Sequence, residues 1–156
     1  MKQPVKQRAT VICRQGTQIL LVSRQHGRWA LPGGRPKPGE DLAQAAAREL
    51  LEETSLHALG LSYLFEFVGA GTHHRVYIVR TAPGEVPKPG NEIARCRWVE
   101  VADVPALAAS IATKGIVDVL ATPPVKGKVR RPGRRGRQDA FSRNVSYAMR
   151  EMGEIV

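Results

Sequence analysis

The sequence predicts a single compact α/β domain. Its 156 residues suit one domain with an ordinary hydrophobic core. Short apolar, β-branched runs bounded by glycine and proline are typical of strands, and one alanine-rich segment has apolar residues at helical spacing. Strands mixed with two helical regions therefore predict a compact α/β arrangement.

The expected elements follow from local signals along the chain. Strands are predicted at 9–14 and 18–23, because Gln15-Gly16-Thr17 between them is a hairpin signature, and a glycine-proline turn follows. The clearest helix covers 41–54, with Asp41 in its first turn, where acidic residues are favoured. The remaining expected elements are strands at 61–68, 75–81 and 94–101, a loop at 83–91, and one or two helical pieces within 103–121.

The predicted helix carries its charged residues at informative spacings. Glu49, Glu52 and Glu53 stand at i, i+3 and i+4, so their carboxylates converge, and Arg48 is four residues before Glu52, within reach of an ion pair. Clustered carboxylates repel one another unless a cation lies between them, and hard oxygen ligands suit Mg²⁺ or Mn²⁺. A single glutamate on a helix is more often part of a solvated face, so the metal-site hypothesis depends on the whole cluster.

The stretch GRPKPGEDLAQAAARELLEETSL, which begins at Gly34, resembles the Nudix box of the MutT-like Nudix hydrolase family. The matching residues are Gly34, Glu40, Arg48, Glu49, Leu50, Glu52, Glu53 and Leu56. Ser55 departs from the pattern, because the family has glycine there, and a left-handed serine would carry a strain of roughly 1 kcal/mol. The resemblance covers about residues 8–121 and implies the family's α/β/α sandwich with a mixed central sheet.

The resemblance also implies roles for the residues of the box. Glu49, Glu52 and Glu53 would ligate one or more Mg²⁺ ions, with Mn²⁺ as the alternative, and the backbone carbonyl of Gly33 would join them. Arg48 would hold the glutamates in place.

Two further glutamates are weaker candidates. Glu92 precedes the last predicted strand, where several family members carry an additional catalytic or metal-binding glutamate; the alternative is a solvated loop residue. Glu40 would pair with basic residues near the start of the helix. Which carboxylate serves as general base is left open.

These residues predict an Mg²⁺-dependent hydrolase of a diphosphate linkage in a nucleoside di- or triphosphate or a related nucleotide. One alternative is a hydrolase of RNA 5′ ends or dinucleoside polyphosphates. Another is a Nudix-fold module that binds nucleic acid without catalysis. Arg28, Arg75 and Arg24 are candidates for phosphate binding, with surface solvation as the alternative for each. His73 and His74 are adjacent, so on a strand they point to opposite faces.

Aromatic side chains give little information on the base. Tyr63, Phe65 and Phe67 are expected on one face of their strand, a pattern more typical of core than of a base-stacking surface. Nucleobase identity is therefore not predicted.

The C-terminal part has a different composition. The net charge is +10, and the segment KGKVRRPGRRGR, from Lys126 to Arg137, supplies seven positive charges with no acid. We expect a hydrolase domain at 1–124, a basic flexible linker at 125–138, and a possible amphipathic helix at 139–156. The linker could attract RNA, DNA or another polyanion, or could simply solubilise the protein. The helix would dock on its own domain, a partner or a second copy in a homodimer.

The remaining signals exclude several classes. No long apolar segment occurs, so neither a signal peptide nor a membrane span is expected. Cys13 and Cys96 match no metal spacing, which predicts buried, reduced thiols in a cytoplasmic protein.

Overall fold

The computed structural model describes residues 3–122, and six strands of that part form one mixed sheet. Its elements are β1 (Lys6–Gln15), β2 (Gln18–Arg24), β3 (Gly33–Gly34), α1 (Leu42–Thr54), β4 (Gly60–Val68), β5 (Thr72–Arg80), β6 (Ile93–Glu100), the 3₁₀ helix η1 (Val101–Ala106) and α2 (Ile111–Ala121). The strand order is β4-β5-β1-β2-β6, with β3 paired to β1. Only β1 and β5 are parallel among these pairs, which makes the sheet mixed, as predicted.

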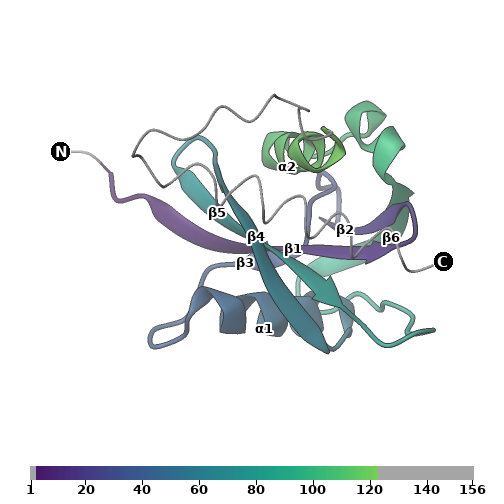
Figure 1. Ribbon diagram of the computed structural model, residues 1–156, viewed down its shortest axis with the longest axis horizontal. Helices are drawn as coiled ribbons and strands as arrows, with labels where there is room; N and C mark the ends of the chain where they lie inside the picture. The colour runs from purple at the N-terminus through teal and green to yellow at the C-terminus, as the bar shows by residue number, and fades with distance from the viewer. Residues whose placement is uncertain (1–2, 123–156) are drawn as a thin grey trace, which may run out of the picture.

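The sheet lies between two helical layers, with α1 on one face and α2 on the other (Figure 1). Side chains of β1 alternate between the two faces. Ala9, Val11 and Cys13 pack in a cluster with Ala45, Ala46 and Leu50 of α1. The other face carries a second cluster, which includes Ile12, Phe65 and Val76 and the α2 residues Ile116 and Val117. Because both faces are covered, the central strands are continuously apolar, and the predicted α/β/α sandwich is confirmed.

Two local features differ from the sequence prediction. The glycines after Pro32, expected as part of a turn, form β3, in which Gly33 and Gly34 pair with Thr10 and Ala9. The strand β4 contains a β-bulge between Tyr63 and Phe65, so strict alternation fails there. Tyr63 therefore packs edge-to-face on Tyr77 of the α1-side cluster, while Phe65 lies in the α2-side cluster.

Helix α1 has a side-chain cap at its N-terminus and a left-handed residue at its C-terminus. Asp41 is the N-cap: its carboxylate accepts from Gln44 N, and the Gln44 side chain accepts from Asp41 N. Ser55 takes the left-handed conformation at the other end, with φ 63° and ψ 9°, and its N–H donates to Leu51 O. The helix therefore ends with serine in a conformation that favours glycine.

The predicted linker at 125–138 and helix at 139–156 lie outside the described residues. Within residues 3–122, no helix combines the length and apolar character needed to cross a bilayer. Cys13 and Cys96 are both free thiols, Cys13 buried and Cys96 half-buried, and burial raises the pKa of Cys13 to about 11. Cys13 is therefore an uncharged core group at neutral pH, as predicted for a buried thiol, whereas Cys96 is less buried than predicted.

Candidate functional site

Arg48 is the centre of a polar network on α1. Its Nε and Nη2 donate to the two carboxylate oxygens of Glu40 at 2.7 and 2.8 Å, and its Nη1 donates to Glu49 and to Glu52, each at 3.0 Å. Nη2 also donates to the Arg35 carbonyl at 3.1 Å. Bonding to Glu40 raises the pKa of Arg48 above its usual range, and Arg48 lowers the pKa of Glu40 to about 2. All three guanidinium nitrogens are engaged, so Arg48 orients the glutamates instead of offering donors to a ligand.

Glu53 lies deeper than its neighbours on α1, only 5% exposed. Gly33 N donates to its Oε2 at 3.2 Å, which fixes the carboxylate against β3. Burial raises the pKa of Glu53 to about 7, with the Gly33 N–H bond opposing and the charge of Glu49 adding to the shift. Burial also raises the pKa of Glu49. The two carboxylates thus stand in a site that disfavours uncompensated negative charge.

The glycines of β3 let these carboxylates approach the backbone. A Cβ on Gly33 would overlap the Ala9 carbonyl of β1, and a Cβ on Gly34 would overlap the carboxylate of Glu49. Gly33 also has φ +151°, which an L-residue rarely adopts. The close approach of β3 to β1 therefore requires glycine at position 33, whereas a side chain at position 34 would displace the Glu49 carboxylate.

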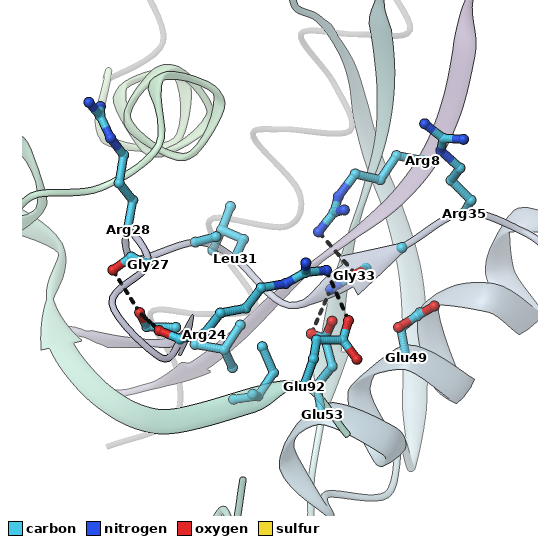
Figure 2. A pocket seen from close by; sticks show the side chains of 15 residues that line it. Arg8, Arg24, Gly27, Arg28, Leu31, Gly33, Arg35, Glu49, Glu53 and Glu92 are labelled. Atoms are coloured by element: carbon cyan, nitrogen blue, oxygen red, sulfur yellow. Dashed lines mark hydrogen bonds and ion pairs between the residues drawn. The ribbon is translucent and has the colours of Figure 1, made fainter. Parts of the chain in front are cut away.

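A cleft of about 540 Å³ opens beside β3 and the N-terminal end of β1 (Figure 2). Glutamates line one side of the cleft, and four arginines line its other sides. The charged residues of its lining are Glu49, Glu53, Glu92, Arg8, Arg24, Arg28 and Arg35. Figure 2 shows Arg8 directed at Gly33 and Arg24 at Glu92, whereas Arg28 and Arg35 extend away from the carboxylates.

Of the three glutamates predicted to bind metal, Glu52 does not line this cleft. Arg48 Nη1 holds its Oε2 at 3.0 Å, and Asn91 Nδ2 donates to the same oxygen at 3.3 Å. Among the described residues, no three acidic, histidine or cysteine side chains stand close enough to form a ready metal cluster. The backbone carbonyl of Gly33, also predicted to bind metal, already accepts a hydrogen bond from Arg8 Nη2 at 3.0 Å.

Glu92 reaches the cleft because the loop before β6 is fastened to the end of α1. Lys88 N donates to Thr54 O at 2.8 Å and Gly90 N donates to Glu53 O at 3.1 Å. Glu92 then forms an ion pair with Arg24 at 3.1 Å, with the two side chains 50% and 70% exposed respectively. An ion pair this exposed contributes little to stability, so both side chains can turn to a ligand at small cost.

A second cavity of about 320 Å³ lies on the α2 side of the sheet and shares Arg8, Ala30 and Leu31 with the cleft. The polar residues of its lining, apart from Arg8, are Thr10, Thr72, His74, Ser110 and Thr113. Thr10 Oγ1 and His74 Nδ1 are 3.0 Å apart, and burial lowers the pKa of His74. The imidazole is therefore neutral at pH 7, and among residues 3–122 Arg8 is the single charged residue in the lining.

Arg75 and His73 lie elsewhere. The Arg75 guanidinium stacks over the Tyr63 ring, 5.3 Å from its centre, and Arg75 does not line the cleft. His73 faces Glu66 at 3.3 Å, whereas its neighbour His74 is buried, as predicted for adjacent residues of a strand. Of the three predicted phosphate ligands, Arg24 and Arg28 line the cleft and Arg75 does not.

The comparison with protein families agrees with this geometry. A family model described as the NUDIX domain matches residues 4–119, which include the sheet, α1 and Glu92. The chain belongs to the NUDIX domain family. Within this NUDIX domain, the box glutamates, Arg48 and Gly33 occupy one side of the sheet, next to the cleft.

Relatives of this NUDIX domain carry several names. The oxidized purine nucleoside triphosphate hydrolase of Danio rerio is 34% identical over 104 residues, covering 61% of this chain and 66% of the relative. Diphosphoinositol polyphosphate phosphohydrolase 2 of Rattus norvegicus is 32% identical over 111 residues, covering 65% of this chain and 62% of the relative. The chain thus spans less than two thirds of these curated relatives.

A solved structure has the same fold over nearly its full length. It is a Chromobacterium violaceum protein described as a nudix hydrolase family member, with a TM-score of 0.68 and 26% identity. The match covers 99% of this chain and 97% of the other. The NUDIX fold is therefore shared well beyond the box.

Sequence reasoning missed Arg8 and the second cavity. Arg8 contacts Gly33, which is 25 residues away, and Thr10 contacts His74, which is 64 residues away. No local spacing signals contacts of that length. The one available hint was an arginine directly before an apolar strand, a position from which a guanidinium can turn back onto the sheet edge.

Proposed function

We propose that this NUDIX domain is a divalent-metal-dependent hydrolase that cleaves a diphosphate linkage in a nucleoside di- or triphosphate or a related nucleotide. The observation that carries the proposal is the pairing of carboxylates with arginines around one cleft. Glu49 and Glu53 stand on one side of it, and Arg8, Arg24 and Arg28 stand around the rest. Such a site can hold a cation and a phosphate chain together.

The donor set fits Mg²⁺ or Mn²⁺. Glu49, Glu52 and Glu53 offer hard oxygen ligands, and Mg²⁺ needs only one or two carboxylates because it keeps several waters. The raised pKa values of Glu49 and Glu53 are a second observation that favours a cation here. Glu49, Glu52 and Glu53 would hold the ion, which would neutralise phosphate charge and make bound water more acidic. The Gly33 carbonyl, the fourth predicted ligand, is bound to Arg8 in this structure.

The chain's own residues supply positioning. Arg48 fixes Glu49 and Glu52, and Gly33 N–H fixes Glu53, so the carboxylates meet the substrate already oriented. Arg24 and Arg28 offer guanidinium groups that bind phosphate oxygens in pairs. Glu92 is released to the cleft when Arg24 turns to a phosphate, because the two are paired in this structure.

The relatives support this substrate class. The Danio rerio relative is named for oxidized purine nucleoside triphosphates, and the Rattus norvegicus relative for diphosphoinositol polyphosphates. Both names describe phosphoric anhydrides, the bond class that the cleft suits. Apart from Arg8 at its boundary with the cleft, the second cavity is lined by hydroxyls, a neutral imidazole and apolar groups, which suit an uncharged part of a nucleotide.

We place the protein in the cytoplasm, with the basic segment 126–137 attracting RNA or another polyanion and residues 139–156 docking on this domain or on a second copy.

The test is Mg²⁺-dependent release of phosphate and pyrophosphate from nucleoside triphosphates, nucleotide sugars, dinucleoside polyphosphates and triphosphate-ended RNA. We expect turnover of at least one class, loss of turnover with a chelator, and loss with Glu52→Gln. Glu66→Gln is the matched control, since Glu66 lies on β4 and lines neither cavity. Turnover that survives Glu52→Gln, or no turnover of any compound, would favour a binding module instead.

A further inference from the structure

Two arginines near the box differ in how their donors are used. Arg48 contacts three carboxylates and one carbonyl. Arg8 is half-buried, and within residues 3–122 its guanidinium forms one hydrogen bond, from Nη2 to Gly33 O at 3.0 Å, and no ion pair. A guanidinium has five N–H donors, so most of those on Arg8 have no protein acceptor in the described part of the chain. Holding such a cation away from water costs free energy unless another group compensates it.

Arg8 occupies the boundary between the two cavities. It lines the carboxylate cleft together with Glu49 and Glu53, and it lines the second cavity together with Thr10 and His74. Figure 2 shows its side chain descending from β1 toward Gly33, with the guanidinium above the carboxylates. A ligand that extends from one cavity to the other must pass this group.

We propose that Arg8 binds the phosphate chain of the substrate where the chain passes from the carboxylate cleft to the second cavity. This inference rests on the proposed function and assigns it a substrate-binding residue. Nη2 keeps its bond to Gly33, while Nε and Nη1 donate to phosphate oxygens. The bond to Gly33 fixes the orientation of the planar group before the ligand arrives.

The neighbours of Arg8 favour a phosphate over a carboxylate ligand. Burial lowers the pKa of Arg8, and the nearby charges of Glu53 and Glu49 only oppose that shift. Neither glutamate pairs with Arg8 directly in the described residues, because Gly33 N–H holds Glu53 and Arg48 holds Glu49. The ligand must also carry enough charge to compete in a cleft with three glutamates. A diphosphate carries several negative charges and offers oxygens in the geometry that a guanidinium fork binds.

The test measures binding of imidodiphosphate, a diphosphate with a nitrogen bridge, to the full chain by calorimetry in the presence of a chelator. We expect Arg8→Gln to weaken binding by about 10- to 100-fold, as for loss of a charge-assisted bond, and Arg8→Lys to fall between. Arg97→Gln removes the same charge from an exposed position on β6 that lines neither cavity. It should bind within twofold of the unchanged protein.

A structural role of Arg8 predicts a different pattern. If Arg8 serves only to hold Gly33, Arg8→Gln lowers the melting temperature but leaves the affinity for imidodiphosphate within twofold, and that result overturns the proposal. If Arg8→Gln fails to fold, Arg8→Lys decides: unchanged affinity overturns the proposal, and a loss of about tenfold supports it. Failure of the unchanged protein to bind imidodiphosphate also overturns it.

Turnover separates this inference from the proposed function. A raised KM with little change in kcat in Arg8→Gln is expected for a residue that binds substrate and transition state equally. Arg8-dependent binding without any hydrolysis would support the inference while refuting the hydrolase. Hydrolysis by the unchanged protein, together with unchanged imidodiphosphate binding in Arg8→Gln, would support the hydrolase and refute the inference about Arg8.

Discussion

Glu53 differs from the other carboxylates of α1 in its surroundings. It is 5% exposed, and burial raises its pKa from the ordinary 4.5 to about 7. Because the folded pKa lies above the unfolded one, the folded protein binds this proton more tightly between those two values. The resulting contribution to stability is present at low pH and is lost as the pH rises through 7.

We predict that the metal-free protein becomes less stable between pH 5 and pH 8 through Glu53. Glu53→Gln should remove this dependence and raise the free energy of unfolding at pH 8 by about 1–3 kcal/mol relative to the unchanged protein. Urea denaturation with a chelator at pH 5, 6, 7 and 8 measures the difference. Asp118→Asn, at an exposed position on α2, is the control. Parallel curves for Glu53→Gln and the unchanged protein would contradict the prediction.

Ser55 carries a backbone conformation that glycine adopts without strain. Its φ is 63°, and its hydroxyl donates to Lys88 O at 3.1 Å at an exposed position. We predict that Ser55→Gly stabilises the protein by about 0.5–1 kcal/mol, because relief of the left-handed strain outweighs loss of one exposed hydrogen bond. Thermal and urea unfolding test this. Ser55→Ala, which loses the bond and keeps the strain, should be destabilising, and a stabilising Ser55→Ala would refute the account.

At the scale of elements, β3 joins the sheet to the site. Its two glycines pair with β1, while Gly33 N holds Glu53 of α1. A residue with a side chain at Gly33 would collide with the Ala9 carbonyl, which is backbone and has little room to move. The position of the carboxylates therefore depends on the distance between β1 and β3.

We predict that Gly33→Ala costs about 2–4 kcal/mol of unfolding free energy, from steric overlap and an unfavourable φ of +151°. Gly39→Ala is the matched control. Gly39 also has positive φ, at +79°, but a Cβ there meets nothing within 4 Å. It should cost only about 1 kcal/mol. Equal losses in urea denaturation would show that the Ala9 contact is relieved by movement of β3.

Elements with a long local signal were predictable from sequence. The helix α1 was predicted at 41–54 and begins at Leu42 with Asp41 as its cap, because capping and apolar spacing are local properties. The strand β3 and the bulge in β4 were not predicted. A two-residue strand of glycines exists only because β1 lies beside it, and a bulge is set by packing on both faces of the sheet.

The site divides in the same way. The Arg48–Glu52 ion pair follows from the i, i+4 spacing and was predicted. The contact of Arg48 with Glu49 was expected from the resemblance, which has Arg48 hold the glutamates. Glu40 was expected to pair with basic residues near the start of the helix; its partner is Arg48, eight residues away, because the folded loop carries Glu40 there. The same limit applies to Arg8, whose role depends on how β1 and β3 are placed.

At the scale of the whole molecule, two sources of positive charge have different surroundings. The arginines of the cleft stand beside glutamates, so their charge is partly compensated. The segment 126–137 contains seven of the basic residues and no acid, within a chain of net charge +10. The two sources should therefore bind different ligands, a nucleotide in the cleft and a polyanion along the segment.

We predict that the full chain binds single-stranded RNA with an affinity that falls steeply with salt, with a slope of up to about −5 in log K against log salt for seven contacts. Changing the seven basic residues of 126–137 to glutamine should reduce this slope toward zero while nucleotide turnover changes less than twofold. Fluorescence anisotropy of labelled RNA measures the affinity at salt concentrations from about 50 to about 300 mM, the range in which such binding weakens. A slope that persists in the variant would assign RNA binding to the cleft, and turnover that falls with the charge would make the segment part of the active site.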